Sequence, residues 1–73
     1  MEGKYDLAIC NYNKAIEINP RYFLAWFNKA NVYEVTGRKK EAVEAYKAFI
    51  QYAPAQFTPS IESARQKIRE LGQ

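Results

Sequence analysis

A repeat with a period of 34 residues constrains this sequence more than any other feature. Chain-breaking residues recur at that distance: Gly3 and Gly37, and Pro20 and Pro54. When residues 3–22 are aligned with residues 37–56, five of the twenty positions are identical. Ordinary amino-acid usage gives roughly one identity by chance over such a length. A period of this size is typical of stacked supersecondary units, so we expect the chain to be a stack of similar pieces.

Apolar residues within these pieces favour helices. They recur at spacings of three and four, which places them on one face of a helix. Pro20 and Pro54 cannot continue a helix interior, and Gly37 permits a tight turn between two helices. No segment shows the sustained alternation of a strand. The pattern therefore predicts an all-α fold with four antiparallel helices, placed near residues 4–18, 22–35, 38–52 and 59–71.

Two helix ends have specific signals near the C-terminus. Thr58 followed by Pro59 is typical of an N-cap residue with proline in the first turn. Gly72 follows the last apolar position and indicates a helix stop. We expect the last helix to run between them.

The composition argues against an enzyme. The 73 residues include no His, which excludes a Ser-His-Asp triad, a Cys-His dyad and a His-ligated metal. Cys10 is the single cysteine, so an internal disulfide is excluded and a reducing compartment such as the cytoplasm is expected. We predict no catalytic residues, no metal and no cofactor.

Membrane and nucleic-acid partners are also not expected. No apolar run approaches the roughly 18 residues that a spanning helix needs. The net charge is +3, and the one basic run, residues 38–40, is short. A nucleic-acid site needs cations spread along one face together with exposed aromatic residues. The sequence therefore favours a protein or peptide partner.

The residues from Trp26 to Pro54 resemble a tetratricopeptide repeat. Trp26-x-x-Lys29-Ala30-x-x-Tyr33, Ala42-x-x-x-Tyr46 and Pro54 follow the spacing of that family's pattern. The resemblance implies one TPR-like domain over residues 1–73, an antiparallel helix-turn-helix solenoid. Within it, residues 23–56 are a complete repeat with helices A and B, residues 3–22 are helix B of a preceding repeat, and residues 57–73 are a C-terminal capping helix.

The sequence departs from the family pattern in ways that have a physical reading. Lys29 stands where the family usually has Leu, and its aliphatic stem can lie along apolar surface. Phe49 takes the place that Ala15 holds in the first unit, while Ser60 follows Trp26 by one period. An exchange of large and small partners keeps the core volume roughly constant. We therefore expect Phe49 to point inward, toward the last helix.

The resemblance also implies a binding groove. In the family, A helices line a concave surface that receives an extended or helical peptide. Phe27 stands where members that clamp a terminal carboxylate have lysine, and Glu62 where they have arginine, so that clamp is incomplete here. Arg65 and Arg69 favour an acidic ligand. Carried onto this sequence, the groove consists of Leu24, Phe27, Asn28, Asn31, Glu34 and Val35. The last helix adds Thr58, Ile61, Arg65 and Arg69 one period on.

The first helix lacks the helix A that the repeat pattern places before it. Two explanations stand side by side: the chain is a piece of a longer array, or a second copy covers the open apolar face. An uncovered apolar patch favours symmetric dimers. The alternative function is therefore self-assembly without a separate ligand, through Tyr5, Ala8, Ile9 and Tyr12.

Overall fold

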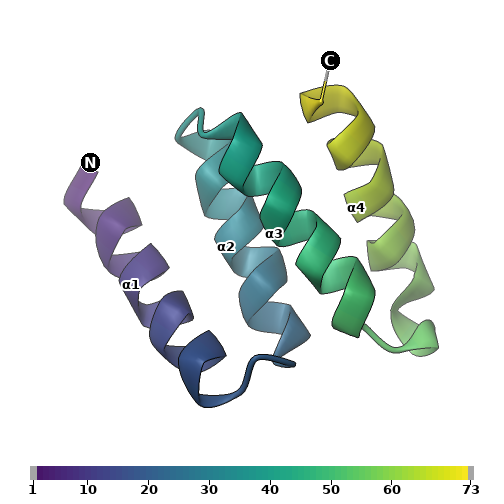
Figure 1. Cartoon of the computed structure of the whole chain (residues 1–73). Coiled ribbons are helices and arrows are strands. Elements are labelled where there is room, and N and C mark those ends of the chain that lie inside the picture. The colour runs from purple at the N-terminus through teal and green to yellow at the C-terminus, as the bar shows by residue number, and fades with distance from the viewer. Residues whose placement is uncertain (1, 73) are drawn as a thin grey trace.

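The computed structural model describes residues 2–72, which form four α-helices and one short 3-10 helix (Figure 1). The elements are α1 (Glu2–Ile18), α2 (Phe23–Val35), α3 (Lys39–Tyr52), η1 (Ala55–Phe57) and α4 (Thr58–Leu71). Successive α-helices run antiparallel, and the described residues contain no strand (Figure 1). The predicted all-α fold and its four helices are confirmed, with every helix end within two residues of the expected position.

The turn between α2 and α3 depends on Gly37, whose φ is +80°. This left-handed conformation is strained for residues with a Cβ atom, which explains why glycine stands there. The Arg38 amide donates back to the Tyr33 carbonyl over 2.8 Å, and the Thr36 hydroxyl donates to the Val32 carbonyl over 2.9 Å. The chain therefore reverses direction while the last carbonyl groups of α2 stay paired.

The start of α4 differs from the prediction. Thr58 is the first residue of the helix and not its N-cap, because the short helix η1 runs directly into α4. The Thr58 hydroxyl donates to the Ala55 carbonyl inside η1, so it points away from the amide groups that a cap would pair. Pro59 lies in the first turn, as expected.

The core is formed by α2, α3 and α4. Small residues let these helices approach closely, and two aromatic side chains of α3 fill the space between them. Phe49 is 1% exposed, and its ring centroid lies 4.8 Å from that of Phe27. The predicted inward orientation of Phe49 is confirmed. The fully buried cluster consists of Ala30, Ala42, Ala45, Tyr46, Phe49 and Ala64.

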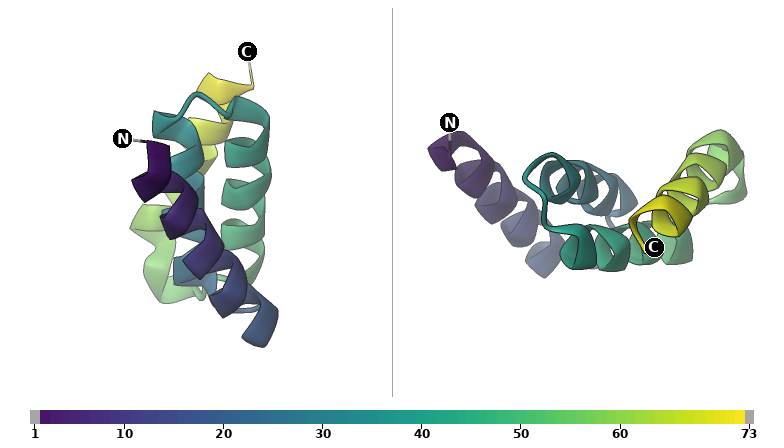
Figure 2. Two further views of the ribbon diagram at one scale, coloured as in Figure 1. Left: turned by 90° about the vertical axis from the view of Figure 1, so that its left-hand side faces the viewer. Right: turned by 90° about the horizontal axis from the view of Figure 1, so that it is seen from above.

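The helices form a plate of 33 × 31 × 15 Å. α2 contacts α3, α3 contacts α4, and α1 packs against α2. Seen from above, α2 and α4 lie on the same side of α3, and α1 lies beyond α2 (Figure 2). In residues 2–72 no helix combines the length and the apolar character needed to cross a membrane.

Trp26 links α2 to the turn that precedes it by a side-chain hydrogen bond. Its indole Nε1 donates to the Pro20 carbonyl over 2.9 Å. The Lys29 ammonium lies 5.0 Å from the Trp26 ring centroid and 5.7 Å from that of Tyr33, within range of a cation–π contact. Partial burial lowers the pKa of Lys29. The Lys29 ammonium thus lies near two aromatic rings at the position where the family usually has leucine.

Candidate functional site

The predicted groove residues of α2 that stay accessible form one stripe. Leu24, Asn28, Asn31 and Val35 are spaced by four, three and four residues, which places them on a single helix face. Leu24 is 42% exposed, Val35 is 65% exposed, Asn28 is exposed and Asn31 is half-buried. Arg65 and Arg69 are exposed one turn apart on α4. We call the surface made by these residues of α2 and α4 the α2–α4 face.

Phe27 and Ile61 have a different role from the exposed groove residues. They stand one period apart, both are half-buried, and both pack against the core cluster. The Phe27 ring centroid lies 6.0 Å from that of Tyr46, in an edge-on arrangement. Much of their apolar surface is therefore already used in packing the helices together.

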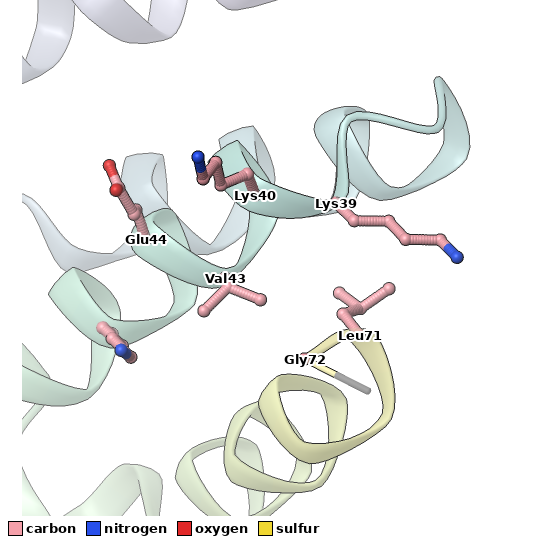
Figure 3. Close-up of a pocket in the computed structure, with 7 residues that line it drawn as sticks. Lys39, Lys40, Val43, Glu44, Leu71 and Gly72 are labelled. Atoms are coloured by element: carbon pink, nitrogen blue, oxygen red, sulfur yellow. The ribbon is translucent and has the colours of Figure 1, made fainter.

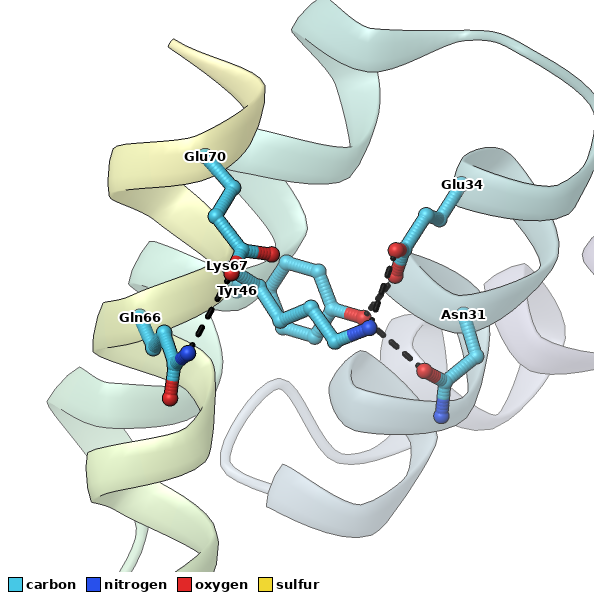
Figure 4. A network of polar contacts seen from close by, with 6 residues as sticks. All are labelled: Asn31, Glu34, Tyr46, Gln66, Lys67 and Glu70. Atoms are coloured by element: carbon cyan, nitrogen blue, oxygen red, sulfur yellow. Dashed lines mark hydrogen bonds and ion pairs between the residues drawn. The ribbon is translucent and has the colours of Figure 1, made fainter.

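A polar network forms the floor of the α2–α4 face (Figure 4). Tyr46 rises from α3, and its Oη lies 2.7 Å from Glu34 Oε1 and 2.8 Å from Asn31 Oδ1, both on α2. Lys67 of α4 donates from Nζ to Glu34 Oε2 over 3.0 Å. Three helices are thus joined by side chains from each of them.

The Tyr46 hydroxyl can donate its hydrogen bond to only one of these two acceptors at a time. A phenol carries a single proton, and the charged Glu34 carboxylate is the stronger acceptor. Partial burial acts to raise the pKa of Glu34, but the bonds from Tyr46 and Lys67 outweigh it and hold the pKa below its ordinary value. Burial and the Glu34 charge raise the pKa of Tyr46. At neutral pH the floor therefore holds one anion, one cation and a neutral phenol.

The charges of Arg65 and Arg69 are not balanced in the same way. The ion pairs within residues 3–72 are Glu34–Lys67 and Asp6–Arg38, and neither arginine takes part in one. The Asn31 amide nitrogen points away from Tyr46 (Figure 4). The α2–α4 face therefore presents two free guanidinium groups and amide donors above an electrically neutral floor.

Sequence reasoning missed two members of this network. The ring of Tyr46 is buried in the core, and the hydroxyl of a buried tyrosine needs a polar partner. That requirement, together with Asn31 and Glu34 on the facing helix, is a signal that sequence alone contains. No such signal exists for Lys67, because its pairing depends on how α4 crosses α2.

The predicted self-association face on α1 is only partly open. Tyr5 is 40% exposed, and Ala8 and Tyr12 are half-buried. Ile9 is 8% exposed, so including it in the open face was wrong: it belongs to the contact with α2, the helix that α1 packs against. Leu7 and Ile18 are strongly exposed on α1 and were not predicted.

The acidic and sulfur-containing side chains form no metal site in the part of the chain that the structure describes. No group of three or more His, Cys, Asp or Glu residues lies close enough together to hold an ion there. Cys10 is exposed on α1 as a free thiol.

Comparison with known proteins places the fold in a family. The family model described as "TPR repeat" matches residues 2–37, and the model described as "Tetratricopeptide repeat" matches residues 23–56. The two matches together span residues 2–56.

Two curated relatives share parts of this sequence. An uncharacterized protein of Methanocaldococcus jannaschii is 47% identical over 45 residues, which is 62% of this chain and 52% of that protein. The human protein O-mannosyl-transferase TMTC3 is 43% identical over 42 residues, which is 58% of this chain and 5% of that protein. The alignment thus spans about half of the archaeal relative and a small part of the human one. With both family models matching in sequence and four antiparallel helices in the structure, this chain belongs to the tetratricopeptide repeat family.

Proposed function

We propose that the α2–α4 face binds an extended or helical segment of another protein and favours acidic segments. Tetratricopeptide repeats generally mediate protein–protein interaction. The observation that supports the proposal is the pair of exposed guanidinium groups, Arg65 and Arg69, which take part in no ion pair among residues 3–72. They stand one period after Asn31 and Val35, so we expect them to extend the surface that exposed Leu24 and Val35 begin. A guanidinium group can hold a carboxylate through two parallel hydrogen bonds, which gives direction as well as attraction.

The floor of the face supports this role by staying fixed. Tyr46, Glu34 and Lys67 link α3, α2 and α4, so a bound segment meets helices whose spacing is already set. A preformed surface loses less conformational entropy on binding than a mobile one. The Asn28 and Asn31 amides can donate to main-chain carbonyl groups of the bound segment.

Peptide selection followed by substitution tests this proposal. Peptides selected from a random display library on the immobilised chain are expected to be rich in Asp and Glu. Arg65→Ala and Asn28→Ala are each expected to weaken the selected peptides about five- to tenfold, in line with the roughly 1 kcal/mol of such contacts. Fluorescence anisotropy gives the dissociation constants.

The matched controls lie away from the face. Arg21→Ala and Asn13→Ala remove the same side-chain types from exposed positions in the α1–α2 region. They should leave the dissociation constants unchanged. Equal losses for the controls, or peptides that bind Arg65→Ala and Asn28→Ala as tightly as the original chain, would refute the proposal.

Self-association through α1 is the second candidate function. It rests on the half-exposed state of Ala8, Tyr12 and Ala15, in contrast to the full burial of Ala42, Tyr46 and Phe49 one period later. A second copy of the chain laid against α1 would cover this apolar surface.

Sedimentation equilibrium over a range of protein concentrations tests self-association. A monomer–dimer equilibrium is expected, and Tyr5→Glu should shift it toward monomer because it places a charge in the contact. Tyr22→Glu is the matched control, since Tyr22 is 45% exposed and lies outside α1. A monomer at every concentration contradicts this second candidate and leaves peptide binding on the α2–α4 face unaffected.

A further inference from the structure

A hollow of about 460 Å³ lies between the first half of α3 and the end of α4 (Figure 3). Its volume falls in the range of about 300–1,000 Å³ that is usual for ligand pockets. It shares no residue with the α2–α4 face. The lining residues are Lys39, Lys40, Val43, Glu44, Lys47, Leu71 and Gly72.

The floor of this hollow is apolar. Val43 of α3 and Leu71 at the end of α4 face each other across it (Figure 3), and both side chains are half-buried. Apolar surface that remains in contact with water gains free energy when another apolar group covers it. The floor therefore suits one apolar side chain of a partner.

The rim of the hollow is positively charged. Three lysines and one glutamate line it, and within residues 3–72 none of these lysines forms an ion pair. Glu44 points away from Leu71, whereas Lys39 extends beside it (Figure 3). The positive end of the α3 dipole lies at the same place, and Arg38 provides no side-chain cap there. The charge therefore favours carboxylates in whatever occupies the hollow.

One period earlier, the corresponding place lies between α1 and the segment that follows α2, and an ion pair joins its two sides. Asp6 in α1 stands one period before Lys40, and it pairs with Arg38 over 3.8 Å. Arg38 stands one period before Gly72. An acidic residue in the first helix thus meets a basic residue from the segment that follows α2. At the later site the helix residue is basic, and the described residues provide no acid opposite it.

We infer that this hollow docks an acidic amphipathic segment of a partner protein. An apolar side chain of the segment covers Val43 and Leu71, and carboxylates beside it lie between Lys39 and Lys47. The site is separate from the α2–α4 face, so the chain can hold one partner segment on each. A second copy of this chain and a simple inorganic anion are the competing occupants.

A synthetic peptide of alternating leucine and glutamate pairs is the probe. Fluorescence anisotropy is expected to show saturable binding to the 73-residue chain at low salt. The double variant Lys39→Glu, Lys47→Glu should weaken binding at least about tenfold, because like charges facing each other across an interface cost several kcal/mol. In a heteronuclear NMR titration the probe should shift the backbone amides of Val43 and Leu71.

The controls separate this site from general charge attraction and from the α2–α4 face. Lys4→Glu together with Lys14→Glu makes the same change in net charge on α1 and should leave affinity within about twofold, since exposed charges far from the site are screened. Equal weakening by this pair overturns the inference. The inference is also overturned if a peptide with serine in place of leucine binds equally well, or if inorganic phosphate displaces the probe. A dimer of this chain that excludes the probe would overturn it as well. If Arg65→Glu weakens binding of the probe and the lysine variants do not, the inference is overturned and the probe binds the α2–α4 face.

Discussion

Tyr12 in α1 and Tyr46 in α3 stand at the same position of the 34-residue unit, and their surroundings differ. Tyr46 is 0% exposed: Phe27 packs on its ring, and its hydroxyl meets Asn31 and Glu34 of α2. Tyr12 is half-buried, and its hydroxyl takes part in none of the side-chain hydrogen bonds among residues 3–72. Burial at this position therefore depends on the side chains that surround it, and not on the residue type.

The neighbouring positions show the same difference. Ala42 is fully buried and Ala8 is half-buried, although both are alanines one period apart. Helices α2, α3 and α4 form a closed core, whereas α1 is held through one face against α2. Matched substitutions in the two regions should therefore change the free energy of unfolding by different amounts.

Truncating the two tyrosines should give the largest difference. We expect Tyr46→Ala to lower the free energy of unfolding by about 3–5 kcal/mol, the range found for buried aromatic residues. Tyr12→Ala should lower it by about 1 kcal/mol, because the site can relax into solvent. Urea unfolding followed by circular dichroism measures both. Equal losses would show that α1 is as well enclosed as α3.

Removing only the hydroxyl groups sharpens the comparison. Tyr46→Phe keeps the ring and removes the bond to Glu34, so the free energy of unfolding should fall by about 1–2 kcal/mol. Tyr12→Phe should change it by less than about 0.5 kcal/mol. The same unfolding experiment applies, and both variants are expected to fold. If Tyr46→Phe left the free energy of unfolding unchanged, the polar network would contribute nothing to stability.

The two ion pairs also distinguish the regions. Glu34–Lys67 joins α2 to α4 over 3.0 Å, while Asp6–Arg38 joins α1 to the α2–α3 turn over 3.8 Å with both side chains largely exposed. Double-mutant cycles should give a coupling of about 0.5–1 kcal/mol for the first pair and about 0–0.3 kcal/mol for the second. A larger coupling for Asp6–Arg38 would contradict a loosely held α1.

The smallest effect concerns pH. Because the folded state holds the pKa of Glu34 below its ordinary value, its stabilising contribution is present above the ordinary carboxyl range and is lost as the pH falls through the folded pKa. The stability difference between the original chain and Glu34→Gln should therefore be largest near neutral pH and shrink in acid. A difference that stays constant down to low pH would show that Glu34 is not held in its charged form.

Most of the fold could be predicted from the sequence because local signals agree with one another. The period, the prolines and Gly37 place the helices, and the apolar spacing identifies the faces that meet. The helix η1 was missed because Ala55, Gln56 and Phe57 have no distinctive turn signal. Thr58 was therefore predicted as the N-cap, but because η1 leads directly into α4, Phe57 is the N-cap residue.

The candidate site was harder to predict. Residues such as Asn28 and Arg65 are exposed as the repeat spacing suggested, because position within a repeat determines which way a helix face points. Phe27 stays a predicted groove residue, but its ring also packs against Phe49, a contact between α2 and α3 that the repeat spacing does not predict. The Lys67–Glu34 pair depends on the crossing of α2 and α4, which no local pattern encodes.

Residues 23–71 form a closed unit, and α1 is attached to this unit through one face. Native-state amide hydrogen exchange tests this difference between α1 and the rest of the chain most directly. We expect the amides of α1 to exchange through a partial opening at a free energy clearly below that of global unfolding, and those of α3 near Tyr46 to exchange only through global unfolding. Equal protection of α1 and α3 would contradict it.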